Sequence, residues 1–304
     1  MLDVRRLRLL CDLDRLGTIA AVAHAHSYTP SAVSQQLSTL EREAGVALLE
    51  RTGRRVTFTA AGRVLVAHAE TVLAALERTT AALAEVSAQL TGPLRIGAFP
   101  TAVRTLLPPA LVALGGDHPA LELRVTELDP VAVPRALRER QLDVGLVQDY
   151  DLAPAEPDAG LDTTPLLDET VHLAVPADAQ TATIPAARDH PWIVATPGTL
   201  CHTVTLQVCR AAGFTPRTRH QADDFATVLA LVAAGQGVSL VPDLAVAGPG
   251  TVAGPGTAVP PPGVKLVALP YRRRTWIAYR KGAAAHPAVT AFVAALRGCL
   301  PPRT

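Results

Sequence analysis

The stretch TIAAVAHAHSYTPSAVSQQLSTLEREAG, residues Thr18 to Gly45, decides how the first part of the chain folds. It predicts two helices separated by a polar break at residues 27–28. Thr29 can cap the second helix with its hydroxyl, and Pro30 suits the first helical position, where a missing N–H costs nothing. Gly45 can end that helix in the left-handed conformation, which glycine adopts without strain. The stretch therefore predicts a helical hairpin with well-defined ends.

The second of these helices has two contrasting faces. Apolar side chains recur at helical spacing along one face, at Val33, Leu37, Leu40 and Ala44. Small polar side chains and one guanidinium occupy the other face, at Ser31, Gln35, Ser38, Thr39 and Arg42. Gln and Ser can hydrogen-bond base edges in a DNA major groove, whereas a merely solvated face would carry more Glu and Lys. The pattern is typical of the recognition helix of a helix-turn-helix, although it also fits an ordinary amphipathic hairpin.

The next segment, LLERTGRRVTFT from Leu48 to Thr59, has two apolar, β-favouring runs around a turn at Thr52-Gly53. This spacing predicts a β-hairpin. Arg51, Arg54 and Arg55 cluster at its tip, against the single acid Glu50. A basic hairpin directly after a recognition helix indicates a wing that contacts phosphates.

These residues together carry a resemblance to a known family. Residues Leu9 to Gly62 resemble the winged helix-turn-helix of LysR-type transcriptional regulators. The matching motifs are Gly17-Thr18, PSAVSQQLSTLE (Pro30 to Glu41), Gly45, Arg51 and TAAG (Thr59 to Gly62). His26 and Leu49 depart from the family pattern, which usually has Leu and Phe at these positions. We expect His26 to be a partly buried residue with a local hydrogen bond, not a ligand or a pH switch.

The resemblance implies binding to a double-stranded DNA operator. The residues expected to contact DNA are Thr29, Pro30, Ser31, Ser34, Gln35, Ser38, Arg42, Arg51, Arg54 and Arg55. The formal net charge of the chain is only +1, so this binding must come from a local basic patch.

A long helix is expected from Thr59 to about Leu90. Its apolar positions form two seven-residue ladders, Leu65, Val72, Thr79 and Val86, and Ala69, Leu76, Leu83 and Leu90. Offset by three and four residues, these ladders match the a and d positions of a coiled coil about 45 Å long. Packing against its own chain is the alternative. The resemblance implies dimerisation through this linker, and we expect a homodimer or homotetramer on a dyad-symmetric site.

Thr91-Gly92-Pro93 marks a boundary, after which strand and helix patterns alternate and predict parallel α/β structure. The resemblance implies a two-lobed effector-binding domain like those of periplasmic binding proteins. The expected domains are a winged helix-turn-helix at 1–58, a linker helix at 59–91 and an effector-binding domain at 92–304. Lobe I would cover about 93–165 and 268–304, and lobe II about 166–267.

A small-molecule effector is expected between the lobes, at the carboxyl ends of strands and the amino ends of helices. The residues at these ends are Pro100, Thr101, Ala102, Gln148, Thr196, Gly198, Thr199 and Leu200. Free N–H groups and a hydroxyl before the lobe II helix would favour an anion. These residues are equally consistent with ordinary turns and caps, and Asp223-Asp224 is better explained as a helix cap.

Composition limits the other classes of function. The chain has 304 residues, 49% of them apolar, which is enough for two or three globular domains. It begins without a secretory signal pattern and contains no run of about 18 apolar residues, so we expect a cytoplasmic protein with no membrane contact. Its four cysteines have no metal-ligand spacing, and no cofactor or metal is predicted.

Cys201 and Cys209 raise the alternative of thiol sensing, because peroxide-sensing members of the family carry two cysteines in this region. Eight residues along one helix separate Cα atoms by about 12 Å, beyond the disulfide limit of about 7 Å, so a bridge would require the helix to unwind. No catalytic motif is present, and an enzyme is not expected. The sequence thus favours an effector-responsive transcriptional regulator, with RNA polymerase as a further candidate partner. An architectural DNA-binding protein without an effector is the other alternative.

Overall fold

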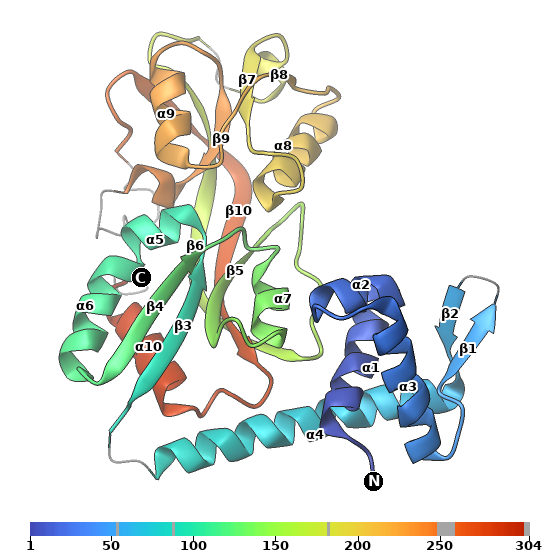
Figure 1. Ribbon diagram of the computed structural model, residues 1–304. Helices are drawn as coiled ribbons and strands as arrows, with labels where there is room; N and C mark the ends of the chain where they lie inside the picture. Colours follow the sequence, from blue (N-terminus) through green and yellow to red (C-terminus); the bar gives the residue numbers. More distant parts are fainter. Residues whose placement is uncertain (53–54, 87–88, 181–182, 248–258, 301–304) are drawn as a thin grey trace. The chain divides into compact units, whose positions relative to one another are not determined.

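A computed structural model describes all of the chain except residues 53–54, 87–88, 181–182, 248–258 and 301–304 (Figure 1). The chain divides into two compact units. The first comprises Met1–Val86 with Arg280–His286, and the second comprises Ser87–Tyr279 with Pro287–Thr304.

The first unit is a winged helix-turn-helix followed by a long helix. Its elements are α1 (Val4–Leu16), α2 (Ile19–Ala25), α3 (Pro30–Ala44), β1 (Leu49–Thr52), β2 (Arg55–Phe58) and α4 (Ala60–Glu85). Leu10, Val22, Val33 and Leu40 are fully buried and form the centre of its core. The apolar stripe predicted for the second helix of the hairpin is therefore the face of α3 that packs on α1 and α2.

The predicted ends of α3 are confirmed. The Oγ1 atom of Thr29 accepts a hydrogen bond from the Ala32 N–H at 3.2 Å, and Pro30 is the first helical residue. Gly45 has φ of 70° and donates its N–H to the Glu41 carbonyl. In the turn before α3, the imidazole Nε2 of half-buried His26 lies 2.7 Å from Asp12 Oδ2, which is the local hydrogen bond expected for this residue.

The TAAG motif joins the wing to α4 through close contacts. Glu41 of α3 accepts hydrogen bonds from the N–H groups of Leu48 and Leu49, at 2.9 and 3.1 Å, and so fixes the start of the wing. The Oγ1 atom of Thr59 accepts from the Gly62 N–H at 2.9 Å and caps α4. A Cβ atom at Gly62 would lie 2.1 Å from the carbonyl oxygen of Leu48, so only glycine fits there.

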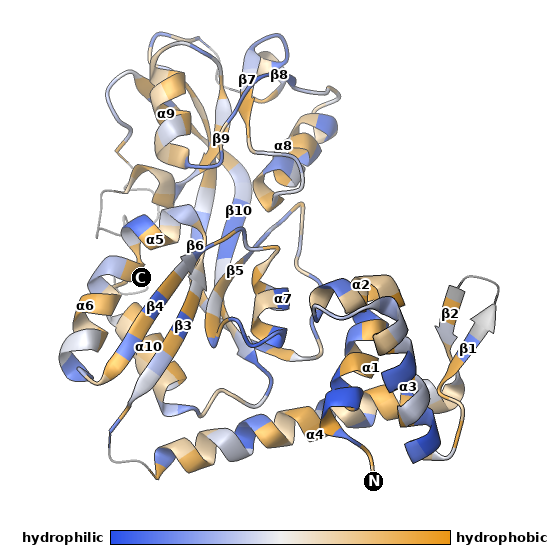
Figure 2. Ribbon diagram, viewed as in Figure 1, coloured by the Kyte–Doolittle hydropathy of each residue, from blue (hydrophilic) through white to orange (hydrophobic). Residues whose placement is uncertain are grey.

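Helix α4 is shorter than predicted, because it ends at Glu85 and not near Leu90. The predicted coiled-coil seam therefore loses its last position, Leu90, which lies beyond the end of the helix. Within α4 and its cap, the large ladder residues Val72, Leu76, Leu83 and Val86 are all exposed. Figure 2 shows the resulting hydrophobic stretches along this helix. The ladder from Val72 onward thus lies at the surface of the unit, whereas its first residues, Leu65 and Ala69, pack in the core.

The second unit is a two-lobed α/β domain, in agreement with the prediction. Its helices are α5 (Pro100–Thr105), α6 (Leu107–Asp117), α7 (Val133–Arg138), α8 (Leu200–Ala211), α9 (Phe225–Ala233) and α10 (Pro287–Gly298), with 3-10 turns η1 (Pro185–Ala187) and η2 (Asp243–Val246). Its strands are β3 (Gly92–Ala98), β4 (Leu121–Glu127), β5 (Val144–Tyr150), β6 (Leu161–Pro176), β7 (Pro191–Val194), β8 (Arg217–Gln221), β9 (Ser239–Pro242) and β10 (Val264–Arg280).

Strands β6 and β10 are the long strands that run through both lobes (Figure 1). They belong to a six-stranded sheet with the order β4-β3-β5-β10-β6-β9, whereas β7 and β8 pair separately. Strands β3, β4 and β5 are parallel, so their carboxyl ends lie at one edge, which faces lobe II. The sheet thereby brings the residues after β3, β4 and β5 close to the start of α8.

Two connecting segments differ from what their sequences suggest. The Pro/Asp-rich run from Tyr150 to Thr164 favours an irregular connection, but β6 already begins at Leu161 within it. The runs VKLVALP and TWIAYR have the pattern of two separate strands, but they form the single strand β10. Most of the Gly/Pro/Ala stretch at 246–263, which has the composition of a loop, lies outside the described residues.

Candidate functional site

The outward face of α3 carries the polar side chains that the sequence assigned to DNA contact. Ser31, Gln35, Ser38 and Arg42 are exposed, as are Thr29 and Pro30 at the start of the helix, and Ser34 is half-buried. The Arg42 guanidinium donates a hydrogen bond to Thr39 Oγ1 at 2.8 Å. Apart from such local bonds, the side chains of this face are free to contact a ligand, and a single α-helix fits into the major groove of DNA.

Only the strands of the wing are described, and the side chains at its tip are not. Strands β1 and β2 pair in antiparallel register from Leu49↔Phe58 to Thr52↔Arg55, which confirms the hairpin. Arg54 and the turn residue before it lie outside the described residues, and the side chains of Arg51 and Arg55 are not described either. The assignment of these three arginines to phosphate contacts therefore stays a prediction.

A cavity of about 160 Å³ lies in the second unit where the two lobes meet. Its walls come from the carboxyl ends of β3, β4 and β5, from the starts of α8 and α9, and from β10. The lining residues are Phe99, Pro100, Thr101, Glu127, Leu128, Asp129, Pro130, Gln148, Ala195, Thr199, Cys201, Asp223, Phe225 and Arg273. The cavity is smaller than the roughly 300 Å³ at which drug-sized pockets begin, so it suits a ligand of only a few heavy atoms.

Arg273 of β10 is the central charged group of this cavity. It is 1% exposed, and its Nε donates to Glu169 Oε1 of β6 at 2.7 Å. The guanidinium carbon also lies 5.3 Å from the ring centroid of Phe99 and 6.0 Å from that of Phe225. Burial opposes its charge, but the carboxylate of Glu169 together with Tyr150 and Cys201 outweighs burial and holds the pKa of Arg273 above its usual value. Arg273 thus connects residues of both lobes at the floor of the cavity.

Unpartnered polar atoms lie beside this arginine. Gln148 is 5% exposed, and its Nε2 has no hydrogen-bond partner in the described part of the chain. The same is true of Oγ1 of Thr275, its partner in the β5–β10 register. Buried donors without partners are rare in proteins, because each costs on the order of 1–3 kcal/mol. Because Gln148 lines the cavity, its free Nε2 indicates a site that a polar ligand can complete.

Two carboxylates of the same lining are already bonded to the backbone. Asp223 accepts from the Thr196 N–H at 2.7 Å and from its hydroxyl at 2.8 Å. Asp129 accepts from the Val131 N–H at 2.9 Å, and burial raises the pKa of this carboxyl. The cavity therefore offers a cationic group on one side and hydrogen-bond acceptors on the other.

The two cysteines of α8 have different surroundings. The Sγ atom of Cys201 lines the cavity and lies 3.6 Å from the Tyr150 hydroxyl, and burial raises the pKa of this thiol despite the nearby Arg273. Cys209 is fully buried in the apolar core of lobe II, and burial raises its pKa to about 12. Both belong to one unbroken helix, as the sequence indicated.

The structure separates the predicted effector residues into three groups. Pro100, Thr101, Gln148 and Thr199 line the 160 Å³ cavity. Leu200 lines a neighbouring cavity instead. Ala102, Thr196 and Gly198 line neither, since Ala102 is fully buried and the other two lie on an exposed turn. Thr199 is also the N-cap of α8, because its Oγ1 accepts from the His202 N–H at 3.3 Å.

Several lining residues were missed by the sequence reasoning. Glu127 ends β4 and residues 128–130 directly follow it, and the rule applied to β3 and β5 would have found them. Asp223 was assigned to a helix cap alone. No local sequence pattern marks Arg273. It lies in the interior of strand β10, and its partner Glu169 is 104 residues away in the sequence. The described residues hold no cluster of His, Cys, Asp and Glu that could bind a metal ion.

Comparisons with known proteins agree with this architecture. A family model for the LysR substrate binding domain matches residues 87–300, and one for bacterial regulatory helix-turn-helix proteins of the lysR family matches residues 4–63. A winged helix-turn-helix joined to a two-lobed ligand-binding domain defines a one-component DNA-binding regulator. The chain belongs to the LysR family of transcriptional regulators.

Among similar proteins, a probable hydrogen peroxide-inducible genes activator of Mycobacterium avium is 33% identical over 256 residues, covering 81% of each chain. The hydrogen peroxide-inducible genes activator of Haemophilus influenzae is 29% identical and covers 82% of this chain and 83% of its own. Among solved structures, a cysteine mutant of Corynebacterium glutamicum OxyR superposes with a TM-score of 0.56 at 26% identity, covering 98% of this chain and 92% of that one. Within the described residues, no helix is both long and apolar enough to span a membrane.

Proposed function

We propose that this regulator reads its operator with the outward face of α3 and holds phosphates with the wing. The exposure of Ser31, Gln35, Ser38 and Arg42 supports this proposal, because the described residues of their own unit leave them uncovered. Gln35 is the side chain best suited to base readout, since glutamine can bond adenine through two atoms at once. Arginines of the wing would bind every sequence alike.

The operator, once located by genomic footprinting of the protein, allows a direct test. Gln35→Ala should reduce the preference for operator over random DNA by roughly 10- to 100-fold in gel shifts. Arg54→Ala should weaken binding to both DNAs equally and reduce the salt slope by about one. Gln89→Ala, at an exposed glutamine outside the winged helix-turn-helix, is the matched control. Unchanged selectivity in Gln35→Ala would remove α3 from the reading role.

The exposed ladder of α4 supports self-association. Four large apolar side chains on one helix, Val72, Leu76, Leu83 and Val86, are 41–84% exposed. A second copy of the same helix would cover them and place two recognition helices on a dyad-symmetric site. Leu76→Glu should therefore turn a dimer into monomers in analytical ultracentrifugation, whereas Thr80→Glu, at another exposed position of α4, should not.

For the second unit, we propose that a small polar effector in the 160 Å³ cavity modulates DNA binding. The unpartnered Gln148 amide beside Arg273 carries this proposal. Arg273 and Gln148 favour an acceptor on the ligand, and Asp129 with Asp223 favours a donor. A short hydroxy acid or amino acid combines both. By contacting both lobes, such a ligand would bias their arrangement and so the affinity for operator.

A thermal-shift screen of short hydroxy acids and amino acids on the full-length chain tests this function. At least one compound should stabilise the protein, by about 2.7 kcal/mol at a hundred times its Kd. Gln148→Leu removes an unpartnered buried donor, so it should keep the fold and lose the ligand-induced shift. Gln221→Leu, at an exposed position, should keep both. If no compound shifts the wild type, an architectural DNA-binding role is favoured instead.

A second candidate function is peroxide sensing at Cys201. It is favoured by the thiol that lines the cavity and by relatives that are peroxide-inducible activators. In that reaction one peroxide oxygen is transferred to the sulfur, giving a sulfenic acid and one water. The raised pKa of Cys201 keeps the thiol protonated at neutral pH and slows this reaction. A bridge to Cys209 would further require α8 to unwind.

Hydrogen peroxide added to the wild type and to Cys201→Ser separates the two candidates. Sensing predicts that peroxide changes operator binding of the wild type only, together with a dimedone adduct on Cys201. Effector control predicts that micromolar peroxide has no effect and that a cavity ligand stabilises both proteins.

A further inference from the structure

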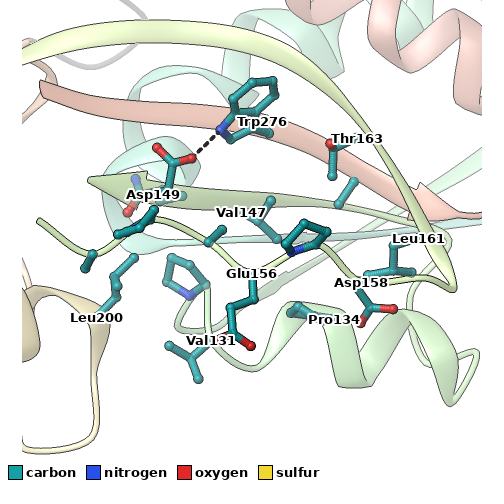
Figure 3. Close-up of a pocket in the computed structure, with 17 residues that line it drawn as sticks. Val131, Pro134, Val147, Asp149, Glu156, Asp158, Leu161, Thr163, Leu200 and Trp276 are labelled. Carbon is teal, nitrogen blue, oxygen red and sulfur yellow. Dashed lines mark hydrogen bonds between the residues drawn. The ribbon is translucent and has the colours of Figure 1, made fainter. Parts of the chain in front are cut away.

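A second, larger cavity adjoins the first one in the second unit. Its volume is about 510 Å³, within the range of pockets for ring-sized ligands (Figure 3). Its walls come from the start of α7, from β5, from residues 153–158, from the first residues of β6 and from β10. Pro130 and Gln148 line both cavities, whereas the charged hub Arg273 lines only the smaller one. The two cavities therefore share a wall but differ in chemistry.

The walls of the larger cavity are mostly apolar. Val147 and Trp276 are cross-strand partners in β5 and β10, so their side chains stand on the same face of the sheet. The indole Nε1 of Trp276 donates to Asp149 Oδ2 at 3.2 Å, which fixes the ring (Figure 3). Four prolines also line the cavity, at positions 130, 134, 154 and 157. An ordered wall loses little conformational entropy when a planar ring packs against it.

The charge of this lining is negative. Asp149, Glu156 and Asp158 line the cavity, and the described lining residues include no Arg, Lys or His. Asp149 is compensated by Arg274, whose Nε donates to its Oδ1 at 2.7 Å, and Asp158 forms an ion pair with Arg138. Exposed Glu156 makes no hydrogen bond or ion pair with any described residue. Glu156 thus supplies the lining with one carboxylate that no described residue compensates, and its side chain lies on the side of the close-up away from Trp276 (Figure 3).

We propose that this cavity is a second ligand site, for an aromatic ring that carries one ammonium group. The ring would pack against Trp276, Val147 and the proline-rich wall, and the ammonium would pair with Glu156. A carboxylate of the same shape would instead meet Glu156 and is disfavoured. Leu200 lines this cavity while its neighbours Thr199 and Cys201 line the other, so occupation of one site would be felt at the start of α8.

Calorimetric titration of the full-length chain with 2-phenylethylamine tests the proposal, with phenylacetate and 2-phenylethanol as anionic and neutral counterparts. The amine should bind one per chain and about tenfold more tightly than phenylacetate, with the alcohol between them. Glu156→Gln should weaken the amine about three- to fivefold, as expected for one exposed charge, and leave the alcohol unchanged. Glu122→Gln, at an exposed glutamate outside the lining, should change nothing.

Tryptophan fluorescence then locates the bound amine. The chain has two tryptophans, and Trp192 is fully buried in the core of lobe II. Quenching by the amine should be lost in Trp276→Phe, while calorimetric binding persists because phenylalanine keeps an aromatic wall. Thr163→Phe, at an exposed strand position in the lining, should reduce affinity at least tenfold by filling the cavity. Equal affinity for amine and phenylacetate, or quenching that survives in Trp276→Phe, would overturn the proposal.

Discussion

Helices α3 and α8 begin in the same way but present different surroundings to a ligand. Thr29 and Thr199 each cap a helix, accepting the N–H three residues later at 3.2 and 3.3 Å. Beyond its cap, α3 presents an exposed polar face, whereas the start of α8 closes on a cavity that contains Arg273. A threonine cap therefore locates the start of a helix, but the elements opposite it decide whether the site is an open surface for DNA or a closed cavity for a small molecule.

The largest difference between the α3 surface and the cavity at α8 should be the loss in free energy of unfolding when a charged residue of the site is removed. Arg273→Met leaves the carboxylate of Glu169 buried without its partner and should destabilise the second unit by about 3–5 kcal/mol. Both tryptophans, Trp192 and Trp276, belong to that unit, so denaturant unfolding followed by tryptophan fluorescence reports on it selectively. No charged residue on the outward face of α3 is expected to matter as much for stability.

A double variant separates charge from packing in this result. Arg273→Met with Glu169→Gln leaves no buried charge and should recover a large part of the lost stability. An equal loss in the single and double variants would mean that the aliphatic and planar packing of Arg273 between Phe99 and Phe225 matters more than its charge.

Removing either cap should have an intermediate effect of similar size in both regions. Thr29→Ala and Thr199→Ala should each cost about 1 kcal/mol of stability, and serine at either position should restore most of it. The functional consequences should diverge, since Thr29→Ala affects operator binding and Thr199→Ala affects ligand-induced stabilisation. Circular dichroism for stability, gel shifts and thermal shifts measure the three quantities. The same loss of operator binding in both variants would contradict the comparison.

Local sequence patterns were sufficient for most of the fold. The Thr29-Pro30 start, the Gly45 end and the Thr59 cap are each specified by residues a few positions apart, so they could be predicted without the tertiary structure. The end of α4 could not, because the apolar seven-residue spacing continues to Leu90 although the helix stops at Glu85. A heptad pattern indicates which face is apolar, and it does not by itself fix where a helix ends.

The cavity was only half predictable for a related reason. Thr101, Gln148 and Thr199 follow the rule that ligands lie at the carboxyl ends of strands and the amino ends of helices. Arg273 lies in the middle of β10, and its role depends on pairing with Glu169 of β6, 104 residues away in the sequence. Groups brought together by a long-range strand pairing leave no local signal, and only the sheet order reveals them.

The smallest expected effect is on the stability of the open surface. Gln35→Ala and Ser38→Ala remove exposed side chains that contribute no packing, so each should change the free energy of unfolding by less than about 0.5 kcal/mol. Leu37→Ala, on the opposite face of the same helix and 2% exposed, should cost about 2–5 kcal/mol. Thermal unfolding followed by circular dichroism measures all three. If Gln35→Ala were as destabilising as Leu37→Ala, the outward face of α3 would contribute to the stability of the domain. A lower affinity of that variant for operator could then no longer be attributed to lost base contacts.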